Sequence, residues 1–241
     1  MKLYKYTTAD YGLAAIRDRR LKVSTLADIN DPNEWLPIMR DPDTGEDWHS
    51  QKVYRQQYKN FWAQRRGFIS FSRLYASLLM WGHYADKFRG VALAFEVLDA
   101  SKIIDVRYIC ERFELGKKER ENPSMDDFEN LISRKDWCWA YEQECRTIVN
   151  LQSCTTQRLA NGDTIYFESF EPERNTHVLK LMGIVLGSEC TVTMEDIHEA
   201  FNKKPPLGFQ VLQLSPDSTT YSLVVSGHTK WNGVDWTQQV F

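Results

Sequence analysis

One segment of the sequence, residues 90–97, constrains the fold more than any other. It reads Gly-Val-Ala-Leu-Ala-Phe-Glu-Val, a nearly continuous apolar run of strand length. Such a run is typical of a strand that is buried on both faces, since a strand with one solvent-exposed face alternates apolar and polar residues. The chain is therefore expected to build a sheet with protein packed on each side of this strand.

Other strand patterns outnumber the helical ones, and the helices cluster early in the chain. Strands are predicted at residues 3–6, 21–24, 68–72, 103–108, 145–151, 165–170 and 178–186, followed by a closing hairpin of 209–214 and 221–225. Helices are predicted at residues 8–19, 48–64, 77–86, 125–135 and 193–202, and the charged stretch 111–124 is predicted to be a loop or insertion. These patterns predict an α+β fold with mixed, largely antiparallel sheets.

The chain has no segment that resembles a linker between domains. Its 241 residues fit one domain, which we place at residues 1–225. Residues 226–241 are expected to form a C-terminal tail without regular structure, in which Trp231 and Trp236 are exposed.

The composition of the sequence, and its lack of targeting and membrane-spanning patterns, favour a cytoplasmic protein. No apolar stretch reaches the roughly 18 residues of a membrane span, and the N-terminus lacks the apolar core of a signal peptide. The five cysteines include no C-x-x-C pair, so buried free thiols are expected rather than disulfides or zinc. Because the histidines are scattered singly, no metal is expected.

The charge of the chain is unevenly distributed. Residues 1–73 carry 13 Lys and Arg against 9 Asp and Glu, an excess suited to steering an anionic small molecule.

Two glutamates, Glu142 and Glu144, are separated by one residue directly before an apolar strand. If the strand begins there, both carboxylates project from the same face of the sheet. Two carboxylates at such a short distance repel each other, so one of them is expected to have a raised pKa unless Arg146 or another cation compensates for the repulsion. The alternative is an exposed strand edge on which these charges pair with Arg146.

Ser70 and Ser72 lie on one face of a predicted strand, where a core strand would normally present apolar groups. Buried hydroxyls need hydrogen-bonding partners, which a catalytic glutamate or a ligand ribose could supply. Equally, the two serines could bond the backbone of a neighbouring turn.

The predicted helix at residues 77–86 divides into two faces. Met80, His83 and Tyr84 share one face, whereas Leu78, Trp81 and Ala85 share the other. One face is expected to pack on the sheet, and core packing is the simpler interpretation for Trp81. The other face offers an aromatic wall that suits stacking on a nucleobase or a pyridinium ring.

Taken together, these strings resemble a bacterial family known as domain of unknown function 2971. The most specific are M-W-G-H-Y-A at residues 80–85 and Y-E-Q-E-C-R at residues 141–146, and the resemblance spans roughly residues 3–200. Weaker matches lie at residues 3–6, 30–32, 70–72 and 184–187.

The order of the strings also resembles the plan of the ADP-ribosyltransferases, which use NAD as a substrate. The resemblance implies that Ser70 and Ser72 form a serine motif, that Glu144 is the catalytic glutamate, and that Glu142 begins the E-x-E motif. It further implies NAD contacts from residues of the first strand and the short helix, namely Tyr4, Lys5, Tyr6, Trp81, His83 and Tyr84. Where those enzymes commonly carry Arg or His on the first strand, this chain has Tyr4, Lys5 and Tyr6.

Three functional hypotheses follow. The first is an NAD-consuming ADP-ribosyltransferase, a toxin or antiviral effector of a bacterium or phage. Its acceptor, whether a protein, a nucleic acid or a small molecule, stays open. The second is a non-catalytic nucleotide-binding or interaction module on the same scaffold. The third, a nuclease-type effector, rests only on the basic N-terminal third and the supply of acidic residues.

Overall fold

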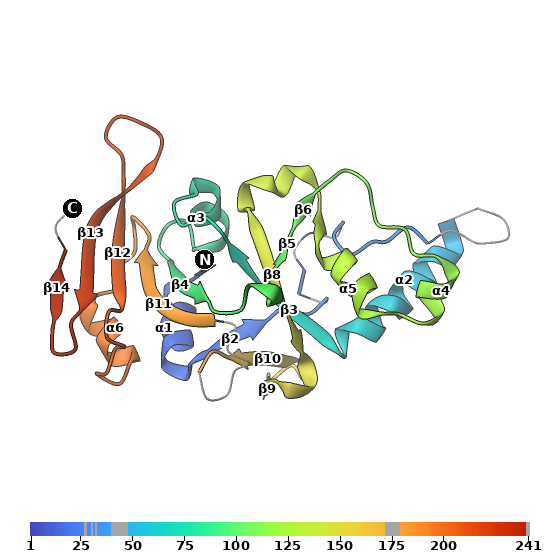
Figure 1. The fold of residues 1–241 in the computed structure, drawn as a ribbon, viewed down its shortest axis with the longest axis horizontal. Helices are drawn as coiled ribbons and strands as arrows, with labels where there is room; N and C mark the ends of the chain where they lie inside the picture. Colours follow the sequence, from blue (N-terminus) through green and yellow to red (C-terminus); the bar gives the residue numbers. More distant parts are fainter. Residues whose placement is uncertain (27, 30, 32, 40–47, 172–178, 240–241) are drawn as a thin grey trace.

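The apolar run that dominates the sequence forms β4 (Val91–Val97), at the centre of a nine-stranded sheet (Figure 1). The structure is a computed structural model and describes residues 1–26, 28–29, 31, 33–39, 48–171 and 179–239. The side chains of Val91, Leu93 and Phe95 are fully buried in one core, and that of Ala92 is fully buried in another. Strand β4 is therefore covered on both faces, as its sequence predicts.

The large sheet has the strand order β14-β13-β12-β11-β4-β1-β3-β8-β5. Besides β4, its strands are β1 (Lys2–Thr7), β3 (Arg66–Ser72), β5 (Ile104–Asp105), β8 (Glu144–Asn150), β11 (Leu179–Leu186), β12 (Gln210–Pro216), β13 (Leu223–Trp231) and β14 (Trp236–Gln238). All neighbours in this order pair antiparallel except β11 and β12. The predicted α+β fold with a mixed, largely antiparallel sheet is thus confirmed.

Two smaller groups of strands flank the large sheet. One is an antiparallel sheet of β2 (Arg20–Val23), β10 (Thr164–Ser169) and β9 (Thr155–Arg158). The other is a parallel pair of β6 (Arg107–Tyr108) and β7 (Arg134–Lys135). The predicted strand at residues 103–108 is split between β5 and β6, because its two ends pair with different partners, β8 and β7.

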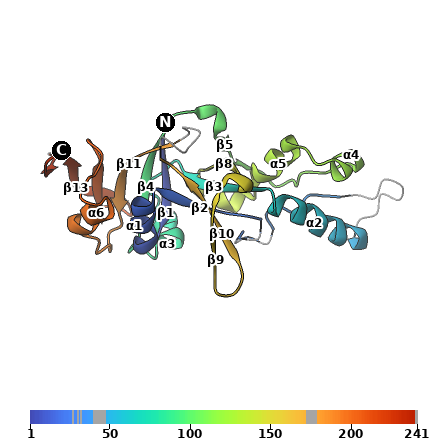
Figure 2. The same cartoon turned by 90° about the horizontal axis from the view of Figure 1, so that it is seen from below.

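The helices cover different parts of this framework. They are α1 (Ala9–Asp18), α2 (Trp48–Ala63), α3 (Leu78–Tyr84), α4 (Lys117–Glu121), α5 (Met125–Ile132) and α6 (Met194–Ala200), with short 3₁₀ turns η1 (Ala100–Lys102), η2 (Trp137–Glu142) and η3 (Leu151–Ser153). Residues of α1 and α6 pack in the same core as Leu93, and residues of α3 pack in the core on the other face. Helices α2, α4 and α5 gather at the end of the molecule opposite to β14 (Figures 1 and 2).

Strands β1 and β3 are neighbours in the sheet but separate almost at once. Their ladder has a single pair, Tyr4 with Ser72, whereas β1 pairs with β4 along its whole length. Lys5 and Tyr6 therefore have no β3 partner in the ladder. On the far side of the gap, Ser24 at the end of β2 bonds to Phe68 of β3 through both backbone amides. The separation of β1 and β3 leaves an opening in the sheet.

Several expectations are wrong. Residues 226–231 and 236–238 are not an irregular tail, because they belong to β13 and β14. Trp231 is buried, and Trp236 is partly buried against the same core, so neither is exposed. The sequence Ser-Gly-His-Thr-Lys has no apolar alternation, so the strand depends on backbone pairing with β12. The stretch 111–124 contains α4. Among the cysteines, Cys145 is buried but Cys110 and Cys138 are exposed.

Parts of three predicted segments lie outside the described residues. These are Asn30 and Pro32 in the string at residues 30–32, Val178 at the start of the strand that becomes β11, and residues 240–241 of the predicted tail.

Candidate functional site

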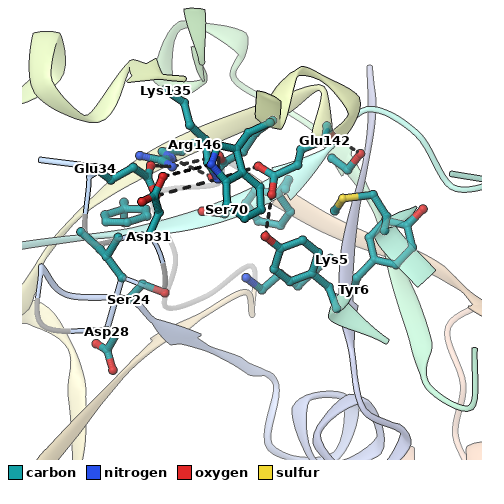
Figure 3. A pocket seen from close by; sticks show the side chains of 18 of the residues that line it. Lys5, Tyr6, Ser24, Asp28, Asp31, Glu34, Ser70, Lys135, Glu142 and Arg146 are labelled. Carbon is teal, nitrogen blue, oxygen red and sulfur yellow. Dashed lines mark hydrogen bonds and ion pairs between the residues drawn. The ribbon is translucent and has the colours of Figure 1, made fainter. Parts of the chain in front are cut away.

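A cavity of about 210 Å³ lies where β1 and β3 separate (Figure 3). This is far more than the roughly 15 Å³ that one water molecule requires, so the opening has room for one chemical group of a larger ligand. Its walls come from β1, β3, β8, α3, η2 and the loop after β2, and the lining residues include Tyr4, Lys5, Tyr6, Ser24, Asp28, Asp31, Glu34, Ser70, Ser72, Met80, Tyr84, Lys135, Trp139, Glu142, Glu144 and Arg146. We call it the first cavity.

The register of β3 and β8 explains the polar wall of this cavity. Ser70 lies opposite Arg146 and Ser72 opposite Glu144, so the four side chains share one face of the sheet. Contrary to the expectation, Glu142 does not lie on the strand. It ends η2, and Gln143, with a left-handed φ of 41°, turns the chain into β8. The predicted strand position of Glu142 is therefore wrong, although both carboxylates line the first cavity.

Five buried charged residues form a single network on this wall, which we call the carboxylate cluster: Glu34, Lys135, Glu142, Glu144 and Arg146. Arg146 donates from Nε to Glu144 Oε1 at 2.7 Å and from Nη2 to Glu144 Oε2 at 2.8 Å. The same Nη2 lies 2.6 Å from Glu34 Oε1. The Lys135 ammonium lies 2.6 Å from Glu142 Oε2 and 3.4 Å from Glu144 Oε2. With all five groups ionised, three carboxylates face two cations, and the cluster is net negative.

Glu144 is held as a fixed anion. Burial alone would raise the pKa of its carboxyl group, but the guanidinium of Arg146 outweighs burial and lowers that pKa to about 2. Lys135 and the Ser70 hydroxyl act in the same direction. Glu144 therefore stays ionised throughout the neutral range.

The surroundings of Glu142 shift its pKa in the opposite direction. Burial raises the pKa of its carboxyl group above the ordinary value, and the neighbouring Glu144 carboxylate adds to the rise, although Lys135 opposes it. The Tyr84 hydroxyl donates to Glu142 Oε1 at 2.5 Å, and burial raises the pKa of that phenol, so Tyr84 remains a proton donor. The pKa of Glu142 is thus raised chiefly by burial, and only to a smaller extent by the repulsion between the two carboxylates that the sequence predicts.

Lys5 supplies a positive charge to the other side of the first cavity. In the part of the chain that the structure describes, its ammonium forms no hydrogen bond or ion pair, and no dashed line reaches it in Figure 3. Burial lowers the pKa of Lys5 to about 8, although attraction to Glu144 opposes the change. An ammonium that is partly removed from water and lacks a partner is ready to bind an anion.

The two predicted serines have different surroundings. The Ser72 hydroxyl donates to the Glu142 carbonyl at 2.7 Å and accepts from the Leu74 amide at 3.1 Å, so it holds the chain on either side of the site. Ser70 faces the cavity beside Glu144. Only Ser70 therefore has a hydroxyl placed to meet a ligand.

The predicted aromatic contacts are brought together only in part. Tyr4, Tyr6 and Tyr84 line the first cavity, and the Tyr6 hydroxyl is fixed by the Leu74 carbonyl at 2.8 Å. Trp81 is fully buried and donates its indole N–H to the Tyr75 carbonyl, so it is a core residue and not part of the cavity wall. His83 is exposed outside the wall, and its ring centroid lies 6.1 Å from that of Tyr141.

Sequence reasoning missed two residues of the cluster, Glu34 and Lys135. Glu34 comes from the turn-prone loop after β2, which is tied down from a distance. Trp139 donates to Asp31 at 3.0 Å, and Arg112 donates to the carbonyls of Asn33 and Leu36. No local pattern indicates these contacts, because more than 70 residues separate each pair. The only sequence signal was the composition of a polar loop that needs anchors.

The acid stability of the protein tests the charge state of Glu144. Because its pKa of about 2 lies below the ordinary 4.5, Glu144 stabilises the fold above pH 4.5, and this contribution disappears as the pH falls toward 2. Urea unfolding should show that Glu144→Gln is less stable than wild type near neutral pH, by on the order of 3 kcal/mol or less, and that the difference shrinks toward about pH 3. A difference independent of pH would show that Glu144 is not paired as described. Glu129→Gln, at an exposed position of α5, is the control.

No helix among the described residues is long and apolar enough to span a membrane. The described residues also contain no group of three or more His, Cys, Asp or Glu side chains arranged to hold a metal ion.

Comparisons with known proteins leave the site to be interpreted from its own geometry. No protein-family model matches the chain. No curated protein and no solved structure matches it either. The resemblance to the bacterial family of unknown function and to the ADP-ribosyltransferases therefore stays a prediction.

Proposed function

We propose that the first cavity binds NAD and that the carboxylate cluster promotes cleavage of the bond between nicotinamide and ribose, with transfer of ADP-ribose to an acceptor. The observation that carries the proposal is the pair of carboxylates, Glu142 and Glu144, on one wall of the cavity. Their surroundings push their pKa values in opposite directions. Such divergence between neighbouring titratable groups is the pattern that assigns different catalytic roles to chemically identical side chains.

Glu144 suits the role of electrostatic stabiliser. When the C1′–N bond breaks, its electron pair passes to the nicotinamide nitrogen and positive charge develops on the ribose, as in glycoside hydrolysis. A carboxylate that is already ionised and held by two hydrogen bonds from Arg146 stabilises that charge without rearranging. Glu144 Oε2 already accepts from both Arg146 and Lys135, so Oε1, which accepts from Arg146 Nε, is the oxygen placed to accept a hydrogen bond from a ribose hydroxyl.

Glu142 suits the role of base toward the acceptor. As the acceptor oxygen or nitrogen forms its bond to C1′, it must lose a proton, and a carboxylate with a raised pKa is a better recipient than one at its ordinary value. Lys135 and Tyr84 fix the orientation of Glu142 by hydrogen bonds to its two oxygens. The proton released by the acceptor would thus end on Glu142.

Lys5 suits the NAD diphosphate, because it is the cation of the first cavity that the carboxylate cluster does not engage. Lys5→Gln is expected to weaken NAD binding by roughly 10- to 100-fold, the value of a hydrogen bond to a charged group. Isothermal titration calorimetry on the full chain measures the change. Lys2→Gln, at an exposed position of the same strand, is the matched control and should bind as wild type does. Equal affinity of the two variants would remove Lys5 from the NAD site.

The second candidate function is a nucleotide-binding module without catalysis. It is favoured by the completeness of the cluster, since Arg146, Lys135 and Tyr84 already engage all four oxygens of Glu142 and Glu144. NAD binding without nicotinamide release, together with unchanged binding in Glu144→Gln, would select it.

A further inference from the structure

A second cavity, of about 330 Å³, adjoins the first. Asp31, Glu34 and Lys135 line both cavities, so the carboxylate cluster forms part of the boundary between them. The remaining walls come from the loop after β2, the segment after β6, and β7 with the start of η2. The loop and the segment after β6 are joined by backbone hydrogen bonds, which Ile38 donates to Phe113 and Leu115 donates to Ile38.

One cation in the wall of the second cavity, Arg134, lacks an acceptor among the described residues. Within the described part of the chain, the Arg134 guanidinium forms no hydrogen bond or ion pair, and its Nε is buried without a partner. It lies over the ring of Phe113, 4.9 Å from the centroid, which leaves the edge of the guanidinium free to donate. A buried N–H without an acceptor is unfavourable, so an acceptor bound there would offset that cost.

In the described part of the chain, none of the acidic residues in this wall accepts a hydrogen bond from Arg134. The carboxylates of Asp31, Glu34 and Asp136 accept hydrogen bonds from Trp139, Arg146 and the Cys138 amide respectively. Glu111 lines the cavity from an exposed position. Burial, and to a lesser extent the neighbouring Arg107, lowers the pKa of Arg134.

We propose that the second cavity binds an oxyanion group, a phosphate or a carboxylate, through the guanidinium of Arg134. The planar fork of a guanidinium matches both oxyanions through two parallel hydrogen bonds. The cavity borders the carboxylate cluster, so the molecule that carries this group is the acceptor of ADP-ribose, an assignment that rests on the proposed function. The acceptor substrate is therefore expected to be anionic.

The side-chain Nε–H resonance of Arg134 reports binding directly. It is assigned by its absence from the ¹H–¹⁵N spectrum of Arg134→Lys, and wild-type protein is titrated separately with inorganic phosphate and with acetate. We expect a saturable shift of this resonance with at least one anion, and the stronger of the two identifies the oxyanion that the site prefers. Backbone amide shifts around the cavity should saturate at the same concentration in wild type, and about tenfold higher or not at all in Arg134→Lys.

Arg107→Lys is the matched control, because Arg107 donates to Asn130 and Ser133 and does not line the cavity. It should retain the wild-type titration. The proposal is overturned if neither anion shifts the Arg134 resonance, or if Arg134→Lys, shown to be folded by its amide spectrum, binds as wild type does. Since this titration contains no NAD, a failure of anion binding is separate from a failure of nicotinamide release.

Discussion

Glu144→Gln is expected to slow nicotinamide release from NAD by about 10²–10³-fold, the usual loss when a group that stabilises transition-state charge is removed. The amide keeps the shape of the side chain but not its charge. NAD binding should change far less than turnover, because the charge on the ribose that Glu144 stabilises develops only as the bond breaks. Nicotinamide release, followed by chromatography at saturating NAD, measures the effect.

The fold should survive this substitution, for a reason that lies in the carboxylate cluster. Without the Glu144 charge, Glu34 and Glu142 face Arg146 and Lys135, so two carboxylates balance two cations. Glu129→Gln should release nicotinamide as wild type does. A folded Glu144→Gln protein with wild-type turnover would show that Glu144 is not catalytic. If that variant does not fold, Glu142→Gln tests the same site, and its release rate should also fall.

Arg146→Met is expected to destabilise the protein by about 3–5 kcal/mol, because it leaves buried carboxylates with too few partners. Lys135 alone would face Glu34, Glu142 and Glu144. Arg146 also donates to the Ile132 carbonyl at 2.8 Å, and that acceptor would lose its partner. Urea unfolding measures the loss, and Arg107→Met, at an exposed arginine, should lose much less.

A double variant separates charge imbalance from lost packing. Arg146→Met combined with Glu144→Gln restores the net charge of the cluster to its original value. It should be more stable than the sum of the single losses predicts, by about 1 kcal/mol or more. Strict additivity would mean that Arg146 and Glu144 do not interact, contrary to the bidentate contact between them.

The fold was predictable where a strand carries its own pattern. The apolar run of β4 indicated burial on both faces, and the alternation of residues 68–72 placed Ser70 and Ser72 on one face, as β3 has them. Strand β9, with the exposed sequence Thr-Thr-Gln-Arg, has no apolar face and depends on pairing with β10. Strands of that kind are set by their neighbours and leave no periodic signal.

From residue spacing alone, the candidate site was predictable only where its residues are close in sequence. Glu142, Glu144 and Arg146 lie within five residues, so spacing alone indicated their interaction. Glu34 is 112 residues away from Arg146, and only the folded chain brings them together. Arg134 and its cavity could not be foreseen, because an arginine without a partner is defined by contacts that it does not make.

The most direct test of the proposed function is the release of nicotinamide by the wild-type protein incubated with NAD in buffer without added metal. We predict release that continues over many turnovers, with water or an acceptor from a cell lysate taking the ADP-ribose, and that falls by about 10²–10³-fold in Glu144→Gln. NAD binding without any release, even when a cell lysate supplies acceptors, would contradict the account and identify the protein as a nucleotide-binding module.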